Sequence, residues 1–383
     1  MNLLQRVSLT TLALAAAVAG AQPAHAAPAW EPLGPLPASG QSALLDTVAF
    51  SDRDVWMLGG QQVQDGSYHG RPLALHFDGA RWTEFPVPGG ATDPIARVAA
   101  LGPKDIWATK AGWQDASKGQ LGLVHFDGQR WSEVTALPVA TGHEVGLFNV
   151  KPYAADNVWV LANSDHTRET GTPVVQRYDG RGWTQLPAPA AGFYYDLDST
   201  DARHPVIVGN TPGRVPALQR WDGSQWKLTE FPQLGKGSLV EIESDRGQLV
   251  ITGDVVSDGV AGADRTSRRA DQRAMARPFA LRWTSGSWVE ERLPVAENEG
   301  DLVLTLRGDG RGGFWAAGTG NEPYVVRNTG RGWTQQPLGP GFTDGHLELH
   351  GIAVVPGTDR AWVAGATHQG ERTRPVNFVG RYR

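Results

Sequence analysis

Tryptophan recurs at long, nearly regular intervals along this chain, and this repeat limits the possible fold more than any other feature. A first series follows dipeptides such as Asp54-Val55, and its members are Trp56, Trp107, Trp159, Trp315 and Trp362. A second series closes Asp-Gly-x-x-Trp units or their eroded equivalents, and its members are Trp30, Trp82, Trp131, Trp183, Trp226, Trp288 and Trp333. A period of roughly 50 residues, with turn signals between short apolar runs, indicates stacked or circular repeats.

Each repeat is predicted to contain four short β-strands. In the first full copy, the runs 44–50, 55–58, 73–77 and 81–85 are separated by turn residues. Asp78-Gly79 predicts a tight hairpin between the third and fourth strands, because such turns need a positive φ. Pro86 and Pro88 then end the fourth strand, since proline cannot continue a sheet ladder.

The repeat is predicted to occur seven times. Val206 replaces the first-series tryptophan in the fourth copy, and Val250 replaces it in the fifth. The seventh copy is divided, because 347–355, 360–365 and 375–382 provide three strands and the segment at Trp30 provides the fourth. An open array would leave exposed strand edges. We therefore predict an all-β, seven-bladed β-propeller whose last blade is closed by the N-terminal strand.

The repeated aromatic residues are interpreted as packing between blades. A third series precedes the last turn of each repeat, and its members are Phe77, Phe126, Tyr178, Trp221 and Trp283. Large aromatic side chains at fixed positions are suited to filling the space between neighbouring sheets. Of the 15 tryptophans, only Trp113 lies outside the three series.

The first 26 residues are predicted to be an export signal. Arg6 precedes an uncharged apolar run over 7–21, and Ala24-His25-Ala26 is a small-residue cleavage site. We expect residues 27–383 to form a single propeller domain that is secreted, extracellular and monomeric. The chain has no cysteine for a lipid anchor, and we expect no membrane anchor.

Composition argues against several classes of partner and chemistry. The formal net charge is −5, and nucleic acid or an anionic membrane surface would need a basic field. The chain has no Gly-x-Ser-x-Gly elbow, no His-Glu-x-x-His pair and no phosphate-binding loop. We expect no cofactor.

These motifs resemble a group of secreted bacterial β-propellers with Asp-Val-Trp and Asp-Gly-x-x-Trp repeats, loosely grouped with kelch and galactose-oxidase-like propellers. The resemblance covers residues 27–383 and concerns architecture rather than a particular activity. The kelch doublet is clear only at Gly59-Gly60. Galactose-oxidase copper chemistry needs a cysteine cross-linked to tyrosine, and a chain without cysteine cannot provide it.

Ligand recognition is expected at the connections between the second and third strands of each repeat. Their lengths vary widely, and they span 61–72, 111–121, 163–173, 210–216, 254–278, 319–323 and 366–374. Variable loops on a rigid scaffold are where recognition residues concentrate. Trp113 lies in one of them and is a candidate for stacking on a sugar ring or a partner surface. The alternative is that Trp113 pins its own loop.

The central channel is a second candidate site. Aligning the innermost strands on the first tryptophan series places polar residues at matching positions. The candidate ligand-binding residues are Asp46, Arg97, Asn149, Asp196, Glu241 and Arg307, with Thr305 and Glu243 close in register. Such a ring is able to hold a polar ligand, but a channel filled with water would also have a polar lining.

No metal site is predicted. His346, Glu348 and His350 alternate along one strand and therefore share a face. The two histidines are about 13 Å apart along that strand, which is too far for all three residues to bind one ion easily.

Two main classes of function remain open. We expect a non-catalytic recognition protein that binds an extracellular glycan or protein surface through its variable-loop face. The alternative is a glycan hydrolase or lyase with Asp46, Asp196, Glu241 and His350 as catalytic residues, because glycan cleavage needs only two suitably spaced carboxyl groups. A structural partner in a secreted assembly is a third possibility.

Overall fold

The computed structural model describes residues 29–383 apart from 39, 64–69, 112, 116–121, 136–143, 165–170, 257–274, 296–297, 300–301, 321, 343–345 and 369–374. The predicted export signal and much of the variable connections lie outside these residues. Within the described parts, no helix has the length and apolar character needed to cross a membrane.

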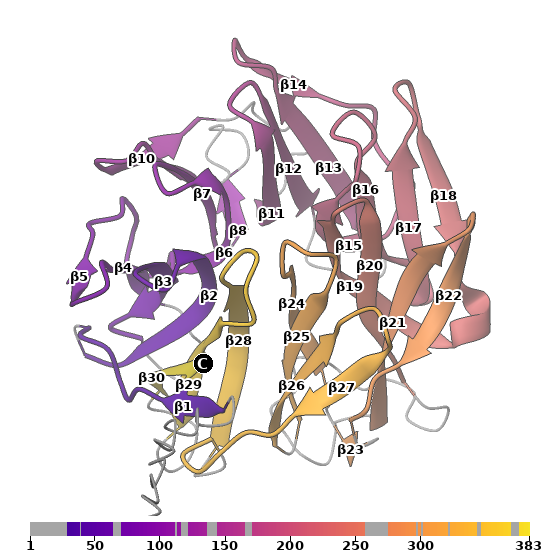
Figure 1. Ribbon diagram of the computed structural model, residues 1–383. Coiled ribbons are helices and arrows are strands. Elements are labelled where there is room, and N and C mark those ends of the chain that lie inside the picture. Colours follow the sequence, from indigo (N-terminus) through magenta and orange to yellow (C-terminus); the bar gives the residue numbers. More distant parts are fainter. Residues whose placement is uncertain are drawn as a thin grey trace, which may run out of the picture.

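Seven antiparallel sheets form blades arranged in a ring (Figure 1). Blade 1 contains β2 (Ser42–Ser51), β3 (Asp54–Gln61), β4 (Arg71–Phe77) and β5 (Trp82–Glu84). Blade 2 contains β6 (Ile95–Gly102), β7 (Asp105–Lys110), β9 (Leu123–Phe126) and β10 (Trp131–Val134). Blade 3 contains β11 (Glu144–Ala154), β12 (Asn157–Ser164), β13 (Thr172–Tyr178) and β14 (Trp183–Gln185), and β8 (Trp113–Asp115) pairs with β11 as a fifth strand.

The remaining blades follow the same plan. Blade 4 contains β15 (Phe193–Asp198), β16 (Val206–Thr211), β17 (Val215–Trp221) and β18 (Trp226–Glu230), and η2 (Pro232–Leu234) follows it. Blade 5 contains β19 (Lys236–Asp245), β20 (Gln248–Val256), β21 (Met275–Thr284) and β22 (Ser287–Arg292), with β23 (Asn298–Glu299) paired to β21. Blade 6 contains β24 (Leu302–Gly308), β25 (Phe314–Thr319), β26 (Pro323–Asn328) and β27 (Trp333–Gln336).

Blade 7 combines strands from both ends of the described chain. It contains β28 (His346–Val354), β29 (Ala361–His368) and β30 (Pro375–Tyr382), and β1 (Trp30–Pro32) pairs antiparallel with β30. The innermost strands contact one another in the order β2, β6, β11, β15, β19, β24, β28 and back to β2. The protein is therefore an all-β, seven-bladed β-propeller, as the tryptophan repeat predicts.

The Asp-Gly-x-x-Trp motif forms the turn between the third and fourth strands. In blade 1, one carboxylate oxygen of Asp78 accepts the backbone N–H groups of Ala80 and Arg81, both at 2.9 Å. Gly79 has a φ of 92°, which explains why glycine follows the aspartate. Equivalent turns begin at Asp127, Asp179 and Asp222. These backbone bonds hold the pKa of Asp78 below its usual value.

The first-series tryptophans pack against the following blade. Trp56 is 1% exposed, and its ring centroid lies 4.8 Å from that of Phe126 and 5.9 Å from that of Trp131, both in blade 2. The same contact recurs elsewhere in two pairs, Trp315–Trp30 and Trp362–Trp82. The hydrophobic core thus lies between the blades, and the prediction that these residues pack there is confirmed.

Basic or imidazole side chains cover these tryptophans from the third strand. His76 stacks on Trp56 at 4.6 Å between centroids, and its Nε2 lies 2.8 Å from a carboxylate oxygen of Asp54. His125 makes the same 2.8 Å contact with Asp105. Arginines take this place in three other blades, as Arg177 over Trp159, Arg327 over Trp315 and Arg381 over Trp362. Both histidines therefore have structural roles, as the repeat predicts.

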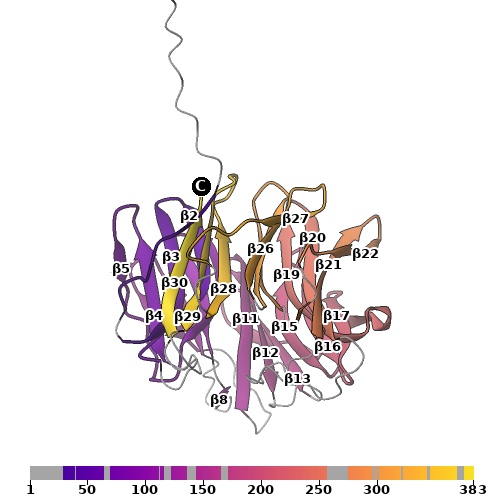
Figure 2. The same ribbon diagram turned by 90° about the horizontal axis from the view of Figure 1, so that it is seen from below.

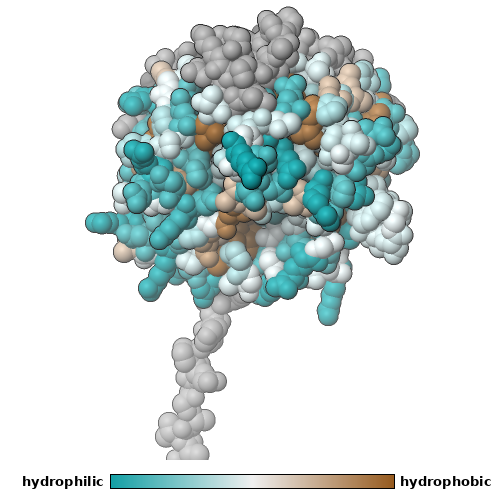
Figure 3. Space-filling view, turned by 90° about the horizontal axis from the view of Figure 1, so that it is seen from above, coloured by the Kyte–Doolittle hydropathy of each residue, from teal (hydrophilic) through white to brown (hydrophobic). Residues whose placement is uncertain are grey.

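Two blades lack the first-series tryptophan. Val206 lies opposite Arg220, and Val250 lies opposite Arg282, in the register that places Trp56 opposite His76. On the outside, the side of the molecule shown in Figure 3 carries mainly hydrophilic residues, and hydrophobic ones form small, separate patches.

Trp56→Ala is expected to lower the free energy of unfolding by about 3–5 kcal/mol, because it opens a cavity between blades 1 and 2. Urea denaturation measures this change. Trp283→Ala is the control, since Trp283 is 47% exposed and its loss should cost about 1 kcal/mol or less. Equal losses for the two variants would contradict the assignment of the core to the first tryptophan series.

Candidate functional site

Every innermost strand carries a bulge at the same level of the channel. The residues that directly follow these register shifts are Asp46, Arg97, Asn149, Asp196, Glu241, Thr305 and Gly351. A bulge bends its strand and re-aims the adjacent side chains. The alignment predicted Asp46, Arg97, Asn149, Asp196 and Glu241 at this level, and the register confirms it, whereas Arg307 lies two residues beyond Thr305. That these residues bind a ligand stays a prediction.

A second tier lies two residues further along each strand, where side chains return to the same face. Its members are Val48, Ala99, Lys151, Asp198, Glu243, Arg307 and Ala353. We call the charged and amide residues of the two tiers the channel cluster. It consists of Asp46, Arg97, Asn149, Lys151, Asp196, Asp198, Glu241, Glu243 and Arg307.

Asp46 ties three blades together. Its buried carboxylate accepts the backbone N–H of Thr47 at 2.8 Å and that of Val98 in blade 2 at 2.9 Å. Arg307 of blade 6 donates to the same carboxylate at 2.9 Å. Gly351 of blade 7 packs closely against the backbone of Asp46, because a Cβ there would lie 2.9 Å from the Cα of Asp46.

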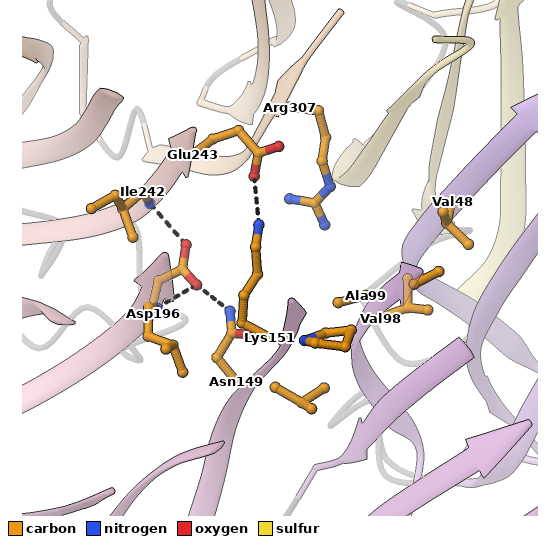
Figure 4. Close-up of a pocket in the computed structure, with 13 residues that line it drawn as sticks. Val48, Val98, Ala99, Asn149, Lys151, Asp196, Ile242, Glu243 and Arg307 are labelled. Carbon is orange, nitrogen blue, oxygen red and sulfur yellow. Dashed lines mark hydrogen bonds and ion pairs between the residues drawn. The ribbon is translucent and has the colours of Figure 1, made fainter. Parts of the chain in front are cut away.

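Asp196 connects blades 3, 4 and 5 in the same way that Asp46 connects blades 1, 2 and 6. Its carboxylate accepts the backbone N–H groups of Leu197 and of Ile242, both at 2.8 Å. The side-chain amide of Asn149 also donates to it (Figure 4). Both predicted aspartates are thus occupied by bonds within the protein.

Arg97 and Glu241 link blades 2 and 5 across the channel. Arg97 donates from Nη2 to Oε1 of Glu241 at 2.6 Å, and Nη1 of Arg307 lies 3.8 Å from Oε2 of Glu241. The side chain of Glu241 is 3% exposed. Four of the predicted channel residues, Asp46, Arg97, Glu241 and Arg307, therefore meet as ion pairs.

Lys151 connects the second tier. Its Nζ lies 2.8 Å from Asp198 of blade 4 and 3.7 Å from Glu243 of blade 5. Figure 4 shows Lys151, Glu243 and Arg307 around a hollow of about 180 Å³. This hollow is the space that remains in the channel beside the ion pairs.

The channel cluster contains five carboxyl groups and three basic groups. Burial, together with the nearby charge of Asp196, raises the pKa of Glu241 to about 8, although Arg97 and Arg307 oppose the shift. Burial also raises the pKa of Asp196 to about 6 and that of Glu243 to about 6. Glu241, Asp196 and Glu243 therefore retain protons above the usual titration range of carboxylates.

His350 lies apart from these ion pairs. It is the bulge residue of β28, and its Nε2 is 3.8 Å from Oε2 of Glu348. Burial lowers its pKa. In the described residues, no group of three or more His, Asp or Glu side chains is arranged to hold a metal ion.

Trp113 belongs to a strand rather than to an irregular loop. β8 pairs with β11, with Trp113 opposite Gly146. Figure 2 places β8 at the end of the blades opposite to the C-terminus. The indole itself lies outside the described residues, so the prediction that it contacts a ligand stays a prediction.

Sequence reasoning missed the roles of Lys151 and Asp198. Both follow a recognised channel residue by two positions, so the period of a β-strand was the signal that could have found them. The sequence carries no such signal for the partners of Lys151 and Asp198 on neighbouring blades. Those partners depend on which blades lie side by side in the closed ring.

No family model and no curated protein matches this chain. Among solved structures, it is similar to "YCF48 bound to D1 peptide", with 14% identity and a TM-score of 0.56 over 92% of this chain and 94% of the other. YCF48 from Cyanidioschyzon merolae matches with 13% identity and a TM-score of 0.54, over 92% and 98% of the two chains. An ulvan lyase from a new family of polysaccharide lyases, bound to -[GlcA(1-4)Rha3S]-, matches with 10% identity and a TM-score of 0.54, over 91% and 95%. At these identities the similarity shows the β-propeller fold alone.

The unfolding free energy is expected to fall as pH rises from about 4 to about 8. The folded chain keeps protons on Glu241, Asp196 and Glu243 that the unfolded chain releases at ordinary carboxyl pKa values, so raising the pH favours unfolding. Urea midpoints measured across this range test the sign. Glu241→Gln should flatten the dependence above about pH 6, and a wild-type midpoint that rises throughout would contradict retention of protons by these three carboxyl groups.

Proposed function

We propose that this protein is a secreted, non-catalytic β-propeller that recognises an extracellular glycan or protein surface through its variable-loop face. The observation that carries the proposal is the occupancy of the channel carboxylates. Asp46 and Asp196 accept backbone N–H groups from neighbouring blades, and Glu241 pairs with Arg97. These groups hold blades together, which supports a role in binding rather than in acid–base chemistry.

The surroundings of Trp113 support the choice of face. Because β8 extends the sheet of blade 3 beside the innermost strand β11, its backbone is held close to the channel by sheet hydrogen bonds. A residue on a paired strand is positioned more firmly than one in a free loop. Propellers whose solved structures hold a peptide or a saccharide share this fold, which is consistent with either kind of ligand.

Export is part of the same proposal. The apolar run over 7–21 and the cleavage site ending at Ala26 support a secreted, extracellular location. A chain without cysteine also folds without needing an oxidising environment, because propeller packing rather than disulfides stabilises it.

One observation favours the glycan hydrolase or lyase as a second candidate. The raised pKa of Glu241, about 8, would keep this carboxyl group protonated at neutral pH, as a general acid requires. Against it, the side chain is 3% exposed and bound to Arg97, so a glycosidic oxygen would have to displace that partner.

Retention on immobilised polysaccharides, followed by analysis of released products, tests the proposal. We expect the purified chain to be retained on at least one resin and to release no oligosaccharide. Trp113→Ala is expected to bind that resin with roughly tenfold lower affinity. Circular dichroism confirms that the variant is folded. Product release that disappears in Glu241→Gln would establish the enzyme instead, and unchanged retention of Trp113→Ala would remove this residue from the binding surface.

A further inference from the structure

The interface between blades 4 and 5 opens into a hollow beside its buried core. Val206 of β16 occupies the position at which five other blades carry a first-series tryptophan. The hollow measures about 760 Å³, and buried Val206, Leu218 and Leu249 line its apolar part. This volume falls within the range of sites that hold small molecules, roughly 300–1,000 Å³. A space of ligand size thus lies where the repeat tryptophan is missing.

Two tryptophans of blade 5 border this hollow. Trp283 is 47% exposed, whereas Phe126 and Trp221 at equivalent positions are 3% and 9% exposed. The rings of Trp283 and Trp288 lie 5.1 Å apart at an angle of 63°. Elsewhere a first-series tryptophan of the preceding blade packs against this aromatic pair, but Val206 is too short to do so. Apolar indole surface is therefore available to a ligand.

The rim of the hollow is polar and nearly balanced in charge. Hydroxyl groups of Ser199, Thr200, Thr229 and Ser287 line it. Lys227 of the lining lies 3.5 Å from Asp222, and the ring of His204 lies 2.7 Å from the carboxylate of Asp201. Arg220 is the remaining basic residue of the lining. The rim thus offers many hydrogen-bond donors and acceptors without a strong electrostatic field of one sign.

We propose that this groove binds an oligosaccharide, with a sugar ring stacked on Trp283 and Trp288. A pyranose has an apolar C–H face and hydroxyl groups around its edge, and the groove presents indole surface bordered by hydroxyl and charged groups. A highly charged polymer would need a stronger field than this lining provides. A peptide that adds to a sheet needs a free strand edge, whereas Val206 and Leu218 are paired on both sides.

The groove is on the face opposite to the variable connections. Its rim includes the turns 199–205, 222–225 and 284–287, which join first to second or third to fourth strands. In an antiparallel blade these turns lie at one end, and the connections between second and third strands lie at the other. The groove is thus a second binding surface that does not depend on the proposed function of the loop face.

Titration of four probes, cellohexaose, xylohexaose, chitohexaose and mannohexaose, tests the groove by calorimetry and tryptophan fluorescence. We expect at least one hexaose to bind the purified chain, and Trp283→Ala to weaken it by about tenfold. Val206→Trp should weaken binding at least as much, because it restores the missing side chain without removing any rim group. Leu228→Ala is the matched control, since Leu228 is 43% exposed but lies outside the groove, and it should bind like the wild type.

Three results would overturn the assignment. If a hexaose still binds to both Trp283→Ala and Val206→Trp, the groove is not its binding site. If Trp113→Ala then abolishes this binding, the loop face is the binding site. Failure of all four hexaoses to bind the wild-type chain excludes a saccharide in the groove, while retention on polysaccharide resins still tests the loop face. Binding of a hexaproline peptide in place of the sugars, sensitive to Trp283→Ala, would make the groove a peptide site.

Discussion

Contact between blades is the interaction on which the rest of this structure depends. Each blade is a small twisted sheet that buries its faces only against its two neighbours. Trp56, Trp315 and Trp362 fill these junctions, and each meets an aromatic residue of the next blade nearly edge to face. Edge-to-face packing of large rings contributes energy beyond area burial. This contact recurs around the ring and stabilises the junctions between blades.

The channel adds a second, polar set of connections. Carboxylates on one blade accept backbone N–H groups from the next, as Asp46 does from Val98 and Asp196 does from Ile242. Arg97 and Glu241 join opposite sides of the ring. Buried charges of this kind cost desolvation energy, and breaking one pair leaves the other partner uncompensated. The channel cluster therefore connects blades that are distant in sequence.

Departures from the repeat are more informative about function than the repeat itself. Val206 interrupts the first tryptophan series, and the junction of blades 4 and 5 opens into a groove bordered by Trp283. Trp113 lies outside all three aromatic series, and its strand joins blade 3. The scaffold tolerates valine in place of this tryptophan in blades 4 and 5.

The sequence by itself determined the blade count, the hairpin turns and the level of Asp46, Arg97, Asn149, Asp196 and Glu241 in the channel. It could do so because strands and turns are local and the repeat supplies an internal alignment. Only the tertiary structure decided which charges meet, since Asp46 and Arg307 are 261 residues apart and touch across blade 7. It also decided that the missing tryptophan at Val206 leaves a groove, because whether neighbouring side chains fill a gap depends on packing in three dimensions.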